Sequence, residues 1–522
     1  MTPARLIVVV LGLCVTLLVP VPAALAQETA DVDRRPIEDP LFGVSSVVPE
    51  DWQDLGSGTY GRGTPPDDLA VIAIQSAPAT MDRLWPSLLP QFALDEVPEV
   101  TGELGSDRFD WTLYRFDVGL GDVVLAVELA LTEDDGATHL VLLQSEPADF
   151  DVLREQVLLP AIDAFDVLAP EPTPDPATLG YRVEEVAFPG GSDGVQLAGT
   201  LTLPHGPGPH PAVVLMSGSG AQDRDESIRP VSTIKPFALI ADALTSAGVA
   251  VLRYDDRGVG SSTGDYGSAT LGDLASDGEA ALEYLRARDE IDPARIGVLG
   301  HSEGGLYAAM LAAQDPDIAF VVGMAAPATD GVSLIVAQNE AILRAAGESE
   351  AEIGHAVALA EEAIPLARDG DDTALEGVLR DYYGGLWDRQ PEQDRTILGE
   401  RDAFVERQVE SQLPLYLSDW YRSLLTYDPA PDWARVKVPV LGLFGANDVQ
   451  VVLAQNEPAL RAAVGTGGAT DVEIVVFPDA NHLFQASQTG ALAEYSTLAS
   501  EFTADFLPTL VAWVTERAGV AG

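Results

Sequence analysis

The segment GHSEGG at residues 300–305 constrains this chain more than any other. An apolar run precedes it at 295–299, and a helix-like run follows it at 306–313. A strand, a tight turn and a helix in this order hold the central serine on a strained bend at the carboxyl end of a strand. The glycines on either side of that serine suit the bend because they add no Cβ atom. We therefore expect Ser302 to be a nucleophile, with the N–H of Glu303 facing a developing oxyanion.

A serine nucleophile needs a general base, and only His355 and His482 follow Ser302 in the chain. His355 lies in an acidic, helical region. His482 lies in a loop after a strand-like run at 472–476, so its ring can reach back over the edge of a sheet. We predict that His482 is the base.

The base in turn needs a carboxylate that fixes its tautomer. Asp448 lies just after a continuous apolar run at 438–444, which predicts a buried parallel strand. Asp479 is the alternative, but it is so near His482 in sequence that we expect it to shape the turn. The predicted catalytic set is therefore Ser302, Asp448 and His482.

Residues 179–518 resemble the α/β-hydrolase superfamily, and in particular bacterial secreted serine esterases. Besides the segment at 300–305, the resemblance is carried by VVLMSGSG at 213–220, QDRD at 222–225 and DDRGVGSS at 255–262. The chain order of serine, acid and histidine is also that of these enzymes. Within the last motif we expect an ion pair between Asp255 and Arg257.

The resemblance implies an α/β fold with a mostly parallel sheet and a helical cap inserted at about 327–432. It also implies that the N–H of Ser219 is the second oxyanion donor. The implied activity is that of a carboxylesterase, with a small-molecule ester as substrate, an acyl-enzyme intermediate, and neither cofactor nor metal. An aminopeptidase-like serine peptidase and a non-catalytic surface binding module are the alternatives, and oligomeric state is left open.

The end of the insertion is markedly aromatic, and we interpret it as the roof of the substrate pocket. The side chains that we place there are Tyr416, Trp420 and Tyr421. Packing inside a helical core is the alternative for all three.

Two segments upstream set the domain organisation. Residues 1–26 have the apolar core and small-x-small end of a signal peptide, which predicts a secreted or extracytoplasmic protein, although an uncleaved anchor is the alternative. Residues 169–178 alternate proline with other residues and predict a stiff linker. Between them, alternating runs predict a small α+β accessory domain over 38–168.

Composition excludes several partners. With 29 basic and 82 acidic residues the formal net charge is −53, so phosphates and anionic lipid surfaces are repelled. We therefore expect no nucleic-acid partner, and no stable membrane span once the signal is cleaved. The acidity fits a saline exterior that screens repulsion, or a bias of genomic composition.

Overall fold

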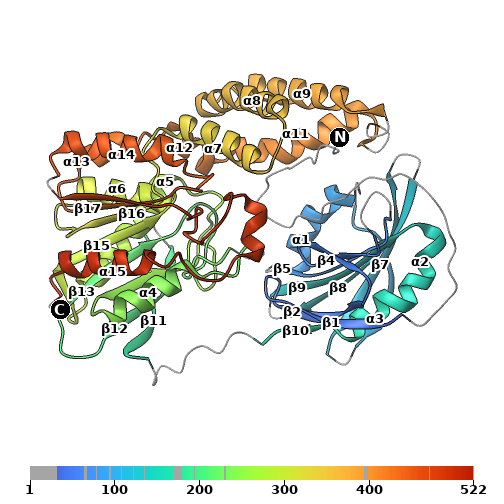
Figure 1. Cartoon of the computed structure of the whole chain (residues 1–522), viewed down its shortest axis with the longest axis horizontal. Helices are drawn as coiled ribbons and strands as arrows, with labels where there is room; N and C mark the ends of the chain where they lie inside the picture. Colours follow the sequence, from blue (N-terminus) through green and yellow to red (C-terminus); the bar gives the residue numbers. More distant parts are fainter. Residues whose placement is uncertain are drawn as a thin grey trace. The chain divides into compact units, whose positions relative to one another are not determined.

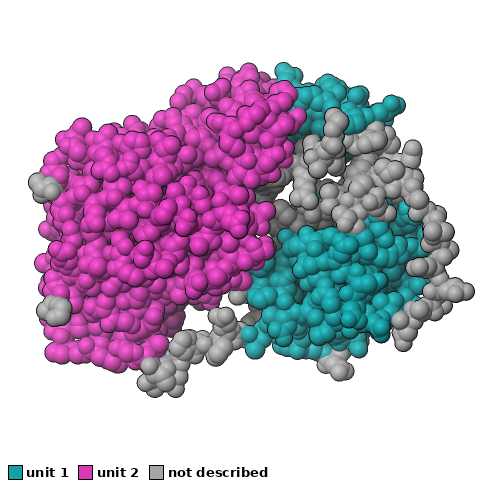
Figure 2. Space-filling model, in the orientation of Figure 1, with its two compact units in different colours: residues 1–173, 380–411 teal, residues 174–379, 412–522 magenta. Residues whose placement is uncertain are grey.

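The computed structural model describes residues 32–520 except 64–67, 78, 93, 95, 107, 121–122, 135, 170–178, 193, 229–230, 393–394, 396–397 and 470. The predicted signal peptide at 1–26 and all but the first residue of the predicted linker at 169–178 lie outside the described residues. Figure 2 colours two compact units, one of residues 1–173 and 380–411, the other of residues 174–379 and 412–522.

The second unit contains an eight-stranded sheet (Figure 1). Its strand order is β11 (Tyr181–Pro189), β12 (Gln196–Pro204), β14 (Ala250–Tyr254), β13 (His210–Met216), β15 (Ile291–His301), β16 (Val321–Met324), β17 (Val440–Gly445) and β18 (Val472–Phe477). β12 is antiparallel to both of its neighbours, and all later pairs are parallel. The expected mostly parallel sheet is thereby confirmed, and the loops after its parallel strands meet at one edge.

Helices cover both faces of this sheet. One face carries α4 (Pro236–Ser246) and α15 (Phe506–Arg517), which pack on each other; the other carries α5 (Leu271–Arg286), α6 (Gly304–Gln314) and α14 (Leu453–Gly467). Every residue of β16 and β17 is buried as a result. This explains the continuous apolar runs, because a strand covered on both faces has no side that must be polar.

The connection from β16 to β17 is long and helical. It contains α7 (Gly331–Ala345), α8 (Glu350–Asp369), α9 (Asp372–Arg389), α11 (Arg401–Leu417), α12 (Asp419–Thr426) and α13 (Ala430–Arg435). Residues 380–411 group with the first compact unit, although they lie within the cap expected at 327–432. The boundaries between the two groups of residues therefore fall within α9 and within α11.

The first unit contains a seven-stranded antiparallel sheet and a three-stranded one. The larger has the order β3 (Gln53–Gly56), β4 (Thr59–Gly61), β5 (Val71–Ala77), β9 (Ala137–Ser145), β8 (Val123–Asp134), β7 (Asp110–Leu120) and β6 (Val100–Gly105). The smaller has the order β1 (Arg34–Asp39), β2 (Val44–Pro49) and β10 (Asp166–Val167). Among the described residues before 170, the helical segments are α1 (Met81–Leu88), η1 (Leu89–Phe92), α2 (Pro147–Leu153), η2 (Arg154–Leu158) and α3 (Leu159–Asp163).

Two apolar cores lie on opposite faces of the larger sheet. Leu140 and Leu142 of β9 pack with α1, whereas Val141 and Leu143 pack with α2, α3 and the smaller sheet. The α+β character expected here is what the structure shows. The fold begins earlier than the expected residue 38, because β1 starts at Arg34; this strand is largely exposed and contains Pro36, so no apolar alternation marks it.

None of the helices in the described ranges is both long and apolar enough to cross a bilayer.

Candidate active site

The strand-to-helix turn holds Ser302 in a strained conformation. β15 ends at the preceding residue, α6 begins two residues later, and Ser302 has φ of 52°. Its N–H donates to the carbonyl of Met324 on the neighbouring strand, 2.8 Å away. A Cβ atom on Gly300 would overlap the carbonyl oxygen of Gly304, and one on Gly304 would overlap the carbonyl oxygen of Met216. Only glycine fits both places, which explains the two glycines of the sequence motif.

The predicted base and acid are hydrogen-bonded to each other. Nδ1 of His482 lies 2.8 Å from Oδ2 of Asp448, and both side chains are buried. The other carboxylate oxygen of Asp448 accepts the N–H groups of Gln450 and Val451 at 2.7 and 2.9 Å. Because the carboxylate accepts at Nδ1, the Nε2 atom of His482 is the one free to take a proton. Asp479, the alternative acid, is exposed, and within the described ranges it forms no hydrogen bond with His482.

Ser302, the predicted nucleophile, is not hydrogen-bonded to this pair in the part of the chain that the structure describes. Within the described ranges, no hydrogen bond joins the Oγ atom of Ser302 to His482. The two loops are nevertheless adjacent, since the rings of His301 and His482 lie 4.7 Å apart. A nucleophile and its base are often loosely placed without substrate and tighten when it binds.

The predicted oxyanion donors are two backbone N–H groups, those of Ser219 and Glu303. Neither takes part in a hydrogen bond within the described ranges. The residues beside Ser219 are both anchored: the N–H of Gly218 donates to Oε1 of Glu226, and that of Gly220 donates to the hydroxyl of Tyr266, each at 2.8 Å. The loop therefore presents one unused donor between two fixed ones, an arrangement suited to a developing negative charge.

The model of the alpha/beta hydrolase family matches residues 213–495, which is more than half of the chain. The chain belongs to the alpha/beta hydrolase family. It is similar to the esterase EstD of Thermotoga maritima, with 25% identity over 79% of this chain and 81% of the relative. It also resembles the quorum-quenching protein AidA of Acinetobacter baumannii, with 30% identity over 38% of this chain and 61% of the relative.

The carboxylate of Glu303 joins the helical insertion of this hydrolase to the turn of Ser302. It is buried and accepts hydrogen bonds from Nε1 of Trp420 at 3.0 Å, from the hydroxyl of Tyr266 at 3.4 Å and from the hydroxyl of Tyr307. Burial raises the pKa of Glu303 above its ordinary value, and these donors oppose the rise. The sequence motif predicted a role for the backbone of this residue but none for its side chain.

The three predicted pocket residues are placed differently from one another. Trp420, on α12, reaches the turn through Glu303. Tyr421 is buried, with its ring 5.6 Å from Tyr416 and 5.9 Å from Trp420. The structure thus brings Trp420 to the site and packs Tyr421 inside the cap.

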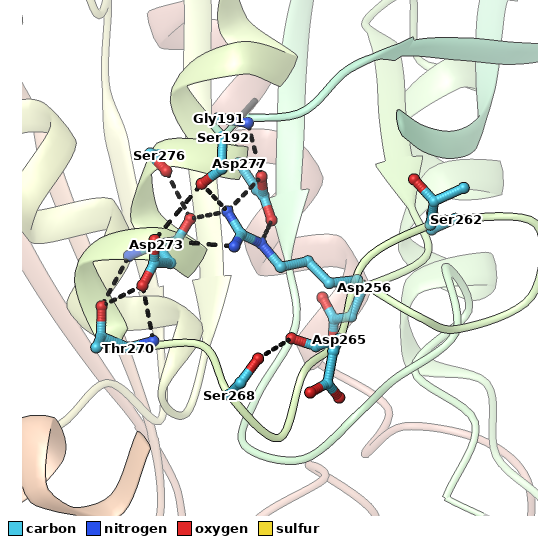
Figure 3. Close-up of polar contacts among 12 residues, drawn as sticks. Gly191, Ser192, Asp256, Ser262, Asp265, Ser268, Thr270, Asp273, Ser276 and Asp277 are labelled. Carbon is cyan, nitrogen blue, oxygen red and sulfur yellow. Dashed lines mark hydrogen bonds and ion pairs between the residues drawn. The ribbon is translucent and has the colours of Figure 1, made fainter. Parts of the chain in front are cut away.

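The expected ion pair between Asp255 and Arg257 is wrong, because each residue has a different partner. Asp255 pairs with Arg224 at 2.7 Å. Arg257 reaches Asp277 on α5, with Nη2 3.1 Å from Oδ1, and Figure 3 shows Asp277 beside Gly191 and Ser192. Neighbouring residues on a turn point in different directions, so adjacency in sequence did not imply contact.

Asp256, for which the sequence motif predicted no role, anchors the loop that carries Ser219. Its carboxylate accepts the hydroxyl of Ser217 at 3.1 Å and the N–H of Gln222 at 2.9 Å. Burial raises the pKa of Asp256 well above its usual range. Among the described residues, no three His, Cys, Asp or Glu side chains are arranged to hold a metal ion.

Proposed function

We propose that this hydrolase is a serine carboxylesterase that acts on small-molecule esters through an acyl-enzyme. The observation that carries the proposal is the bond between His482 and Asp448, formed across two loops that meet beside the strained turn of Ser302. The relationship to an esterase over four fifths of the chain supports esters as the substrate class.

The proposed reaction uses only residues of this site. The Oγ atom of Ser302 attacks the ester carbonyl while Nε2 of His482 takes its proton. The N–H groups of Ser219 and Glu303 bind the oxyanion, and His482 then gives the proton to the leaving alcohol. Water, activated by the same histidine, attacks the acyl-enzyme and releases the acid. Asp448 holds His482 in the required tautomer and stabilises its charged form.

The buried carboxylate beside the nucleophile favours an ester over a peptide with a free amino end. A serine aminopeptidase needs a carboxylate that can bind the substrate ammonium. Glu303 already accepts three hydrogen bonds from side chains of the protein. Oε1 accepts all three, and Oε2 accepts the same N–H of Trp420 at 3.1 Å, so the carboxylate faces the cap and the turn.

The test compares p-nitrophenyl esters of short acyl chains with aminoacyl p-nitroanilides, in the wild type and in Ser302→Ala. We expect ester cleavage and covalent labelling by a fluorophosphonate in the wild type, and neither in the variant, with unchanged melting temperature. Labelling retained in Ser302→Ala would place the nucleophile elsewhere. Faster cleavage of the anilides would favour the peptidase, and no labelling of the wild type would favour a binding module.

We further propose that the protein works outside the cytoplasm, on the strength of the apolar, small-residue-terminated segment at 1–26. The mass of the protein recovered from the medium or periplasm tests this. A form that begins after residue 26 is the expected result, and a cytoplasmic form of full length would contradict it.

A further inference from the structure

A chain of three hydrogen bonds runs beneath the nucleophile turn. Oε1 of Glu226 accepts the N–H of Gly218 at 2.8 Å and lies 2.7 Å from Nδ1 of His301. Nε2 of His301 lies 2.9 Å from the carbonyl oxygen of His482. The chain therefore connects the oxyanion loop, the residue before Ser302 and the loop of the general base.

The partners of His301 define its protonation. Both ring nitrogens face acceptors, a carboxylate on one side and a carbonyl oxygen on the other. A neutral imidazole carries one N–H and would leave one of these contacts without a hydrogen, whereas an imidazolium supplies both. Burial disfavours that charge, but the Glu226 carboxylate and the carbonyl of His482 outweigh it and raise the pKa of His301 above its ordinary value.

Glu226 is held at a cost that a purely structural residue would not need. Its backbone lies in the left-handed region, with φ of 57°, where a side chain costs about 1–3 kcal/mol. The side chain is buried, and its Oε2 atom has no hydrogen-bond partner in the described part of the chain. Strain and an unpaired buried oxygen at one residue are typical of a position set by function.

We propose that Glu226 and His301 form a buried ion pair that positions the oxyanion loop and the loop of His482 around Ser302. This inference rests on the proposed function, because it assigns positioning roles within the same site. Neither residue touches the reacting atoms. Each fixes one backbone group: Glu226 holds Gly218, next to the donor of Ser219, and His301 holds the main chain of the base.

The placement explains why two side chains remote from the chemistry matter for the rate. Loss of one oxyanion donor costs about 100-fold to 1000-fold in kcat, and small misplacements act in the same direction. Loosening the loop of Ser219 and the loop of His482 should therefore lower kcat and leave substrate binding nearly unchanged.

The charge state is tested first, by nitrogen NMR of the full-length protein labelled with ¹⁵N in its six histidines. We expect one ring with both nitrogens protonated at pH 8, where a histidine of ordinary pKa, about 6.5, is neutral. That signal should disappear in His301→Gln, and in Glu226→Gln it should be replaced by the signal of a neutral ring. It should persist in His355→Gln, which changes an exposed histidine of α8. A His301 ring with one bare nitrogen in the wild type would overturn the ion pair.

Kinetics test the positioning role. We expect Glu226→Gln and His301→Gln each to lower kcat for an ester by about 10-fold to 100-fold, with KM changed less than about threefold. The double variant should have a kcat no lower than that of the less active single variant, because the two residues act as a unit. His355→Gln is the matched control.

Two outcomes would overturn the positioning role: folded single variants with kcat within twofold of the wild type, or losses that multiply in the double variant. Failure of the proposed function is a separate result. It would appear as a wild type that cleaves no ester, while the NMR signal would still decide whether the ion pair exists.

Discussion

The indole of Trp420 donates to the carboxylate of Glu303, with Nε1 3.0 Å from Oε1 and 3.1 Å from Oε2. Trp420 belongs to α12, near the end of the helical insertion, and Glu303 directly follows Ser302. The bond is partly buried and made to a buried carboxylate, so its loss is costly. The helix α12 and the backbone N–H of Glu303, which we propose binds the oxyanion, are therefore coupled through one side-chain contact.

Trp420→Phe keeps an aromatic ring on α12 and removes the donor. We expect kcat/KM for short esters to fall about tenfold, because a hydrogen bond to a charged group contributes about 1.5–3 kcal/mol. Trp433→Phe is the control, since that buried indole donates to the carbonyl of Pro327. It should lower the melting temperature and leave kcat/KM near the wild-type value. Equal kinetic effects in the two variants would contradict the coupling.

Asp448→Asn should lower kcat by about 10³-fold to 10⁴-fold, because an amide in this place favours the wrong tautomer of His482. Ester hydrolysis by purified protein measures the effect. Asp479→Asn, in the same loop as the histidine, changes an exposed carboxylate and should cost less than about threefold. The acid would be misassigned if the second change were the more damaging.

Asp256 and Asp255 provide a matched pair for the pH dependence of stability. Burial holds the pKa of Asp256 well above its usual range in the folded state. The folded state therefore binds the proton of Asp256 more tightly than the unfolded state does. The free energy of unfolding is unaffected below the unfolded-state pKa of about 3.9, and it falls as the pH rises from there through the folded-state pKa. Asp256→Asn avoids that loss, so its melting temperature relative to the wild type should climb between pH 4 and pH 8.

The size of that climb should be about 2–4 °C for each kcal/mol relieved. Asp255→Asn removes the buried one of the two carboxylate partners of Arg224 and leaves Glu185, so it should instead destabilise the protein at neutral pH. Scanning calorimetry across the pH range distinguishes the two. A difference for Asp256→Asn that does not vary with pH would show that its carboxylate carries no burial cost.

The elements of the hydrolase unit could be predicted because their signals are local. The buried runs of β15 and β17 and the glycines around Ser302 each reflect a constraint that acts within a few residues. The bond between Asp448 and His482 could be anticipated because parallel strands end at the same edge of a sheet.

The network around the site could not be predicted, because its contacts join residues far apart in the chain. Glu226 is 75 positions from His301, and Trp420 is 117 positions from Glu303. Tyr266 lies in a loop with no pattern of its own. The sequence does not distinguish a buried carboxylate from an exposed one among its 82 acidic residues, so only the fold shows which carboxylates are buried.

The net charge of −53 predicts a salt effect on stability. The Debye length falls from about 30 Å at 0.01 M to about 3 Å at 1 M, so repulsion among distant carboxylates is screened. We expect the melting temperature to rise as sodium chloride is raised over that range, with much of the gain at moderate concentrations. The gain should shrink near pH 4, where many carboxylates are protonated. A flat or falling curve at neutral pH would show that the acidity has little energetic consequence.

Residues 321–324 of β16 pair one by one with residues 440–443 of β17. The chain therefore leaves the sheet and returns to it at adjacent strands. Of the helices between them, α13 packs on α6 and α14, and α7 to α12 form a detour whose length does not affect the pairing of the two strands. Such a detour is an exchangeable part. A library of caps from other chains should be graftable in place of α7 to α12, with α13 retained, while Ser302, Asp448 and His482 keep their supports, provided that each graft supplies a donor for Glu303.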